Sequence, residues 1–177
     1  STTGQTMGAN DWVFIQLGIN DLYPIALQDG SQTPTAIETR LNAVKARLQL
    51  VIDSIKAHNS NIRVGIIQTF PPAISQDATG NLLQSSFYSL ENYFKKGIAK
   101  WWEILLQDYD TEAKRNEKIY LIGANAIIDR ENDFATALQN IDQYDTTQVE
   151  RQVDDVHPYD GYNQVGDIYS GAIKYFA

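Results

Sequence analysis

Two groups of residues near opposite ends of this sequence have side chains suited to acid–base chemistry. Near the C-terminus, Asp154 stands three residues before His157, and Pro158 follows. A histidine can transfer protons near neutral pH, and a nearby carboxylate can orient its ring and fix its tautomer. Near the N-terminus, Asn20 carries an amide that could point into the crevice at the end of a strand. These residue types predict proton transfer by His157, with Asp154 holding its ring.

The apolar stretch that leads to Asn20 organises the predicted sheet. Residues 13–17 are short, β-branched and aromatic, which favours a strand buried on both faces, as in a parallel sheet. Gly18-Ile19-Asn20-Asp21 then lies at the carboxyl end of that strand, where open α/β sheets bind ligands. Gly18 allows the sharp turn that this position needs.

The rest of the chain alternates between strands and helices, which predicts the α/β class. Two further strands are expected at 62–68 and 118–122, and long helices at 35–58, with a capping box from Thr35 to Glu38, at 86–109 and at 160–176. A short helix at 133–141 and an irregular segment at 142–153 are expected before Asp154. Right-handed crossovers make the three strands parallel and place helices on both faces of the sheet.

Together, the two motifs resemble the SGNH/GDSL hydrolase family. Gly18–Asp21 resembles the Gly-x-Asn-Asp block of that family, and Asp154–Pro158 resembles its Asp-x-x-His block. The run Gly161–Gly166 is similar to the family's passage into its last helix. The resemblance implies a three-layer α/β/α sandwich with a flavodoxin-like parallel sheet. It also implies a serine esterase that needs neither a metal nor a cofactor.

The resemblance further implies a role for each matching residue. His157 would be the general base, Asp154 would orient it, and Asn20 would stand in the oxyanion hole. Gly18 and Gly4 are the glycine candidates for binding the oxyanion or the substrate. Asp155 has the wrong spacing for the triad, and His58 is expected to cap a helix or face water.

The Gly-Asp-Ser block, which carries the family's nucleophile, has no match in this sequence. Exposed serines are expected at positions 31, 75, 85 and 170, but none follows a strand in a sharp turn. We therefore expect residues 1–177 to be the C-terminal portion of one SGNH-like domain. The serine and the first strands would come from upstream or from another chain, which would also cover the apolar edge of the strand at 13–17.

Composition excludes several other classes of site. The net charge of −8 argues against nucleic acid as a partner, and the lack of cysteine excludes disulfides and thiolate zinc sites. No apolar run is long enough for a membrane span, and no signal peptide pattern is visible. An extracellular or virion setting is favoured, although composition leaves the compartment open.

Two other functions fit the sequence. The chain could be a non-catalytic carbohydrate-binding or structural module of a larger extracellular or virion protein, or a generic flavodoxin-like binding domain. The absence of a glycine-rich phosphate loop argues against a nucleotide ligand. If the chain is an esterase, the polar loops favour a carbohydrate ester over a lipid. Trp101 is expected in the core and Trp102 beside it, partly exposed.

Overall fold

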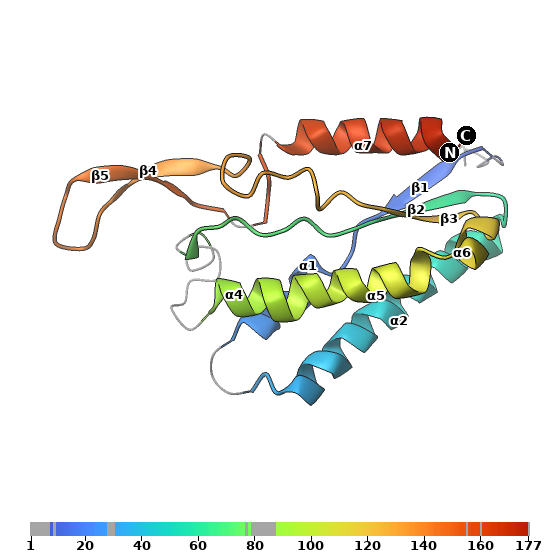
Figure 1. The fold of residues 1–177 in the computed structure, drawn as a ribbon, viewed down its shortest axis with the longest axis horizontal. Coiled ribbons are helices and arrows are strands. Elements are labelled where there is room, and N and C mark those ends of the chain that lie inside the picture. Colours follow the sequence, from blue (N-terminus) through green and yellow to red (C-terminus); the bar gives the residue numbers. More distant parts are fainter. Residues whose placement is uncertain are drawn as a thin grey trace, which may run out of the picture.

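The computed structural model describes residues 8, 10–27, 31–76, 78, 88–154, 156–159 and 161–176. At its centre is a parallel sheet in the order β1-β2-β3, formed by Trp12–Ile15, Arg63–Ile67 and Ile119–Ile122. Helices cover both faces of this sheet (Figure 1). The expected mixed α/β class with a parallel sheet is therefore confirmed.

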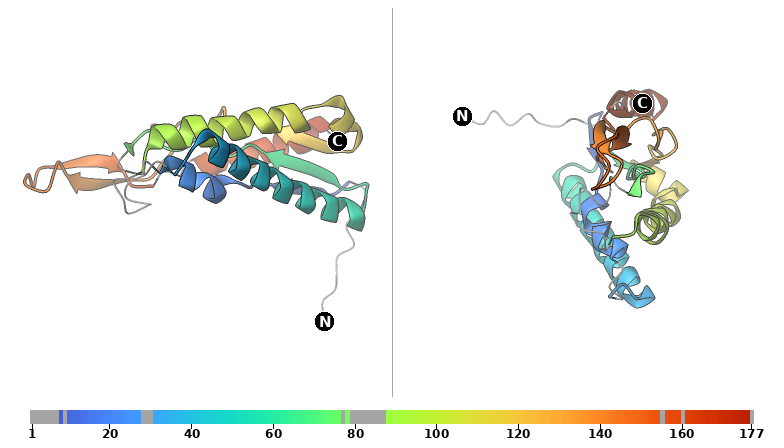
Figure 2. Two further views of the ribbon diagram at one scale, coloured as in Figure 1. Left: turned by 90° about the horizontal axis from the view of Figure 1, so that it is seen from below. Right: turned by 90° about the vertical axis from the view of Figure 1, so that its left-hand side faces the viewer.

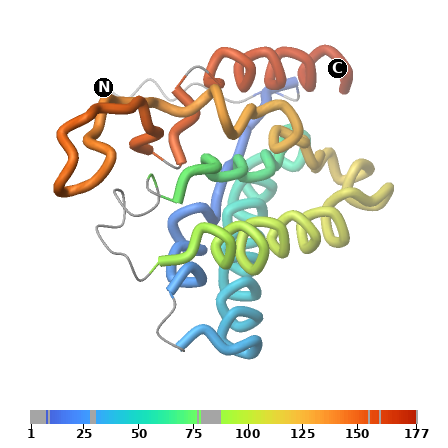
Figure 3. The backbone as a smooth tube through the Cα atoms, turned by 60° about the vertical axis from the view of Figure 1, so that its left-hand side comes forward, coloured from blue at the N-terminus to red at the C-terminus, as the bar shows by residue number. Residues whose placement is uncertain are grey.

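The helices follow the expected alternation with the strands. Their bounds are Ile19–Leu22 for α1, Tyr23–Ala26 for the 3₁₀ turn η1, Pro34–His58 for α2, Leu90–Asn92 for α4, Tyr93–Ile98 for the π-helical turn η2, Ala99–Tyr109 for α5, Glu112–Asn116 for α6 and Gly161–Phe176 for α7. Figures 2 and 3 show α7 on one face of the sheet, and α2 and α5 on the other.

The face under α2 and α5 holds the larger apolar core. From α2 it takes Leu41, Val44, Leu48 and Ile52, and from α5 it takes Trp101, Leu105 and Tyr109. Trp101 is 1% exposed, as expected for a core residue, and Trp102 is partly buried with its indole N–H donating to the carbonyl of Thr69. This apolar core therefore holds α2 and α5 against β1 and β2.

Aromatic rings join α7 to the other face of the sheet. Phe14 of β1 stacks on Tyr169 of α7, with ring centroids 4.7 Å apart. Tyr120 of β3 stacks on Phe176 near the end of the same helix, at 4.3 Å. Gly65 of β2 leaves room for the Phe14 ring, because a β-carbon there would lie 2.5 Å from a Phe14 ring carbon. The missing side chain at Gly65 thus lets Phe14 lie across the central strand.

The segment before Asp154 differs from the prediction. Instead of a helix at 133–141 and an irregular stretch at 142–153, Thr136–Asn140 and Gln148–Gln152 form the antiparallel hairpin β4–β5. The hairpin projects from the body of the molecule (Figure 1), and Leu138 is 66% exposed. Without a core to face, its strands do not need the alternation of apolar and polar residues that predicts a strand.

Several element boundaries and faces also differ from the prediction. The first strand ends at Ile15, so Gln16 and Leu17 are exposed. Thr33, not Thr35, caps α2, because its side chain accepts a hydrogen bond from the N–H of Ala36. Ile52 is buried where Val51 was expected, since a straight helix of 3.6 residues per turn drifts away from a strict seven-residue repeat.

The packing face of α7 was predicted only in part. Val165 is buried and Tyr169 packs on the sheet as expected, but Tyr162 and Ile173 are 49% and 41% exposed. Ala172 is buried in their place. The predicted start of the second long helix, at residue 86, lies outside the described residues.

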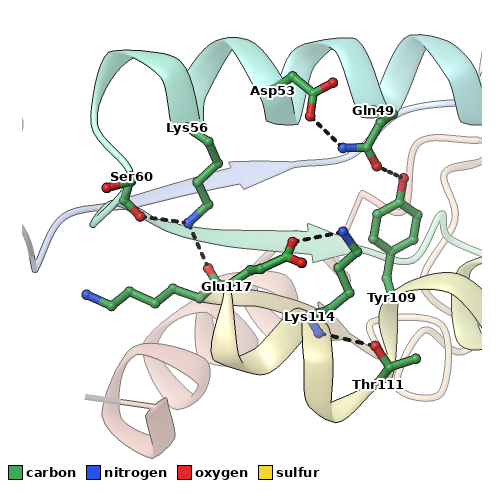
Figure 4. Close-up of polar contacts among 9 residues, drawn as sticks. Gln49, Asp53, Lys56, Ser60, Tyr109, Thr111, Lys114 and Glu117 are labelled. Carbon is green, nitrogen blue, oxygen red and sulfur yellow. Dashed lines mark hydrogen bonds and ion pairs between the residues drawn. The ribbon is translucent and has the colours of Figure 1, made fainter.

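A polar network joins α2 to α5 and to the amino ends of the strands (Figure 4). The hydroxyl of Tyr109 donates to Gln49, which donates in turn to Asp53. The ammonium group of Lys56 donates to the carbonyl of Ile62, at 2.6 Å, just before β2. Burial raises the pKa of Tyr109 to about 12 and lowers the pKa of Lys56. Both groups therefore serve structure at the end of the sheet that lies away from Asn20.

Replacing Gly65 with alanine tests how the sheet is packed. We expect Gly65→Ala to lower the free energy of unfolding by about 1–3 kcal/mol, because the new methyl group overlaps the Phe14 ring. The control is Gly171→Ala on α7, where a β-carbon meets no atom within 4 Å and removal of a helix glycine should stabilise slightly. Urea unfolding measures both variants. Equal effects of the two substitutions would contradict the packing described.

Candidate active site

Asp154 and His157 lie together in the short segment between the hairpin and α7. The Nδ1 atom of His157 is 2.7 Å from Oδ2 of Asp154. The other carboxylate oxygen, Oδ1, accepts hydrogen bonds from the backbone N–H groups of Val156 and His157, at 2.9 and 3.1 Å. One carboxylate thus holds both the turn and the imidazole ring, so the predicted pairing of these two residues is present.

The charge state of Asp154 follows from this geometry. Partial burial by itself raises the pKa of its carboxyl group, but the hydrogen bonds from Val156 and His157 outweigh that effect and hold the pKa below the ordinary value. Asp154 is therefore ionised at neutral pH and acts as an acceptor for the Nδ1 proton of His157. The ring of His157 is exposed, with 62% of its side chain accessible, so Nε2 faces away from its partner into solvent.

The loop after β3 and the base of the hairpin hold this segment in place. Gln152 is buried, and its amide donates to the carbonyls of Arg130 and Glu131 while accepting from the N–H of Ser75. At the start of α7, a β-carbon on Gly161 would lie 2.9 Å from Ile128. Close packing on both sides therefore fixes where His157 emerges.

The turn that carries Asn20 is braced by its neighbours. Gly18 has a φ of 110°, and a β-carbon there would lie 3.1 Å from the indole nitrogen of Trp101. The carbonyl of Ile19 accepts a hydrogen bond from the hydroxyl of Tyr93, and Asp21 forms an ion pair with Arg47 of α2. Gly18, Ile19 and Asp21 thus each contact a neighbouring helix.

Asn20 differs from those three residues because its side chain is exposed and makes no hydrogen bond within the described residues. It belongs to α1, just past the carboxyl end of β1, and Figure 1 shows α1 at the end of the sheet to which β1 points. No hydrogen bond or ion pair links it to Asp154 or His157. The structure therefore brings the acid and the base together, but it does not bring Asn20 into contact with them.

Some of the other predicted site residues are described by the structure, and some are not. Gly4, Asp155 and Ser85 lie outside the described residues. Among the described ones, the His157 side chain has a hydrogen bond only to Asp154, so no serine contacts it. Ser170 stands nine residues into α7, about 13 Å along the helix from its start.

A hollow whose lining includes Tyr159, two residues after His157 in sequence, was missed by sequence reasoning. It has a volume of about 530 Å³, and its polar lining comes from the hairpin and the loop before it, with Tyr159 beside them. Its members are Glu131, Asn132, Phe134, Ala135, Thr136, Glu150 and Tyr159. Tyr159 is 73% exposed. Its place two residues after His157 was the one feature of the sequence that could have indicated a role for it. Glu150 accepts a hydrogen bond from the hydroxyl of Thr136, which helps to shape the hollow.

Within the described ranges, no three histidine or acidic side chains cluster as metal ligands, and none of the helices is long and apolar enough to cross a membrane. Comparison with protein-family models, with curated proteins and with solved structures found no match.

The position of the imidazole proton of His157 tests the acid–base pair. At a pH where the ring is neutral, we expect the proton on Nδ1, because only an N–H at that position can donate to the Asp154 carboxylate. Imidazole ¹⁵N NMR shifts distinguish the two tautomers. His58, which is exposed at the end of α2, provides the internal reference. Asp154→Ala should move the His157 spectrum toward that of His58, and an unchanged spectrum would contradict the pairing.

Proposed function

We propose that this chain supplies the acid–base half of a serine esterase of the SGNH type. In this proposal, a serine attacks the ester carbonyl, and Nε2 of His157 takes the hydroxyl proton. Asp154 stabilises the imidazolium that forms, and His157 then returns the proton to the leaving alcohol. The carrying observation is the 2.7 Å contact between Nδ1 of His157 and Asp154, which leaves Nε2 exposed.

Asn20 takes the oxyanion role in this proposal. Its amide is exposed at the carboxyl end of β1 and has no other partner within the described residues. The braced backbone around it, with Gly18 against Trp101, limits the movement of the turn. A preorganised donor of this kind contributes about 3 kcal/mol to stabilisation of the transition state in other acyl-transfer enzymes. The free amide and the rigid turn together support this role.

The serine would come from a strand beside β1. Within the described residues, β1 pairs only with β2, so its other edge has backbone groups available for a parallel strand. The carboxyl end of such a strand would lie on the same side of the sheet as Asn20. This arrangement would complete the three-layer, flavodoxin-like sandwich that the resemblance implies.

A carbohydrate ester is the substrate that the hollow lined by Tyr159 favours. Glu131, Glu150 and Asn132 offer acceptors and donors for sugar hydroxyls, and the exposed Tyr159 ring offers a flat apolar surface. Two carboxylates in the lining disfavour an anionic sugar. We therefore propose an ester, such as an acetyl group, on a neutral sugar.

The same hollow also favours the alternative function, a carbohydrate-binding module without catalysis. Sugar binding needs only the lining of the hollow, whereas hydrolysis needs Asp154 and His157 in addition. Separate variants can therefore distinguish the two functions.

Hydrolysis of p-nitrophenyl acetate by the complete natural polypeptide tests the esterase. We expect His157→Ala to reduce kcat/KM by at least about 10³-fold, as loss of a triad histidine does elsewhere. The matched control is His58→Ala, which removes the other histidine and should leave kcat/KM unchanged. Labelling with a fluorophosphonate, followed by mass spectrometry, would locate the serine. Full activity of the His157→Ala variant would contradict the esterase proposal.

Binding of neutral oligosaccharides tests the hollow independently of hydrolysis. We expect Tyr159→Ala to weaken binding about tenfold, because the ring supplies the main apolar contact. Tyr175→Ala, which removes another highly exposed tyrosine from the far end of α7, is the control. Sugar binding by a polypeptide without esterase activity would favour the non-catalytic module. If no neutral oligosaccharide binds, the hollow serves neither the esterase nor the binding module.

A further inference from the structure

A groove on the other side of the molecule has no role in the proposed esterase. It lies between the N-terminal half of α2 and the helix formed by η2 and α5, and its volume is about 590 Å³. Figure 1 shows this half of α2 diverging from α5. The volume falls within the range of about 300–1,000 Å³ that is typical of small-molecule sites.

The charge of the groove is opposite to that of the whole chain. Its lining includes four of the eight lysines in the sequence, Lys45, Lys95, Lys96 and Lys100, but only two carboxylates, Glu38 and Asp108. The chain as a whole has a net charge of −8. A cationic groove in an acidic protein favours an anionic occupant.

Two rows of residues face each other along the groove. One row on α2 runs Ile37, Leu41, Lys45, and a facing row on the other helix runs Lys96, Lys100, Ile104, each at four-residue steps. An ion pair between Lys45 and Asp108 of α5 closes one end. Leu41 and Ile104 lie next to that closed end, and Lys96 and Lys100 lie toward the open end.

The ammonium groups at the open end are available to a ligand. Lys96 is exposed and has no ion-pair partner among the described residues, while Lys100 pairs with Glu103 on the surface of the same helix. An exposed pair of that kind contributes little free energy, so a bound anion can replace it. Lys95 and Lys96 also belong to the π-helical turn η2, and such turns occur frequently at functional sites.

We propose that this groove binds a medium- or long-chain carboxylate anion. The alkyl chain lies against Leu41 and Ile104 and against the aliphatic stems of the lysines, and the carboxylate lies between Lys96 and Lys100. An inorganic anion would leave the apolar part uncovered, and a neutral lipid would leave the lysines without a partner. The proposal is independent of the esterase, because none of these residues lies beside His157.

Calorimetric titration with dodecanoate, below its micelle concentration, tests this site in the complete polypeptide. We expect saturable binding that Lys96→Glu weakens by about tenfold or more, through loss of one charge-assisted contact and introduction of repulsion. Lys174→Glu on the exposed surface of α7 makes the same change in net charge and should alter the dissociation constant less than about twofold. Methyl NMR signals of Ile37 and Ile104 should shift on binding.

Two further ligands, and a measurement of the molecular mass in solution that detects self-association, complete the experiment. Butanoate, which has the charge without the chain, and dodecyltrimethylammonium, which has the chain without the negative charge, should both bind much more weakly. Equal binding of the cationic amphiphile, or equal effects of Lys96→Glu and Lys174→Glu, would overturn the proposal. Self-association that Lys96→Glu abolishes, without dodecanoate binding, would assign the groove to a second copy of the chain and would also overturn it.

Discussion

The missing side chain at Gly65 is the constraint on which the position of the candidate site depends. It leaves space above the central strand for the ring of Phe14, and Tyr169 of α7 stacks on that ring. Trp12 also stacks on Phe14, with ring centroids 5.3 Å apart, and extends the aromatic surface along β1. Because α7 is held by this surface, the residues just before it are also held, and His157 is among them.

Much of the fold could be predicted because its core elements have strong periodicity. The three parallel strands and the long helices carry apolar residues at the spacing that burial requires. The hairpin could not be predicted, since Thr136–Asn140 and Gln148–Gln152 project away from the core and need no apolar face. The cap of α2 was misplaced because both Thr33 and Thr35 have a suitable hydroxyl, and only the position of Pro34 in the first turn distinguishes them.

The candidate site could be predicted where its contacts are local in sequence. Asp154 and His157 are three residues apart, so one turn is enough to bring the carboxylate to Nδ1. The exposed Asn20 lies in α1, far from His157 in sequence, and its relation to His157 depends on how the loop after β3 packs against α7. Tyr159 was overlooked because the hollow that it borders exists only when the hairpin forms. The local motif was thus enough to predict the contact between Asp154 and His157, whereas the residues around that contact depend on tertiary packing.

The hollow lined by Tyr159 and the groove between α2 and α5 have linings of opposite charge. Glu131 and Glu150 make the hollow lined by Tyr159 acidic, so it would repel the carboxylate product of the proposed esterase. The lysines of the groove between α2 and α5 have the opposite effect on the same chemical group. Because the core under α2 and α5 separates the groove from the strands, each hollow can be altered without disturbing the other. The two volumes are similar, so in the proposed functions the charge of each lining, rather than its size, distinguishes the ligands.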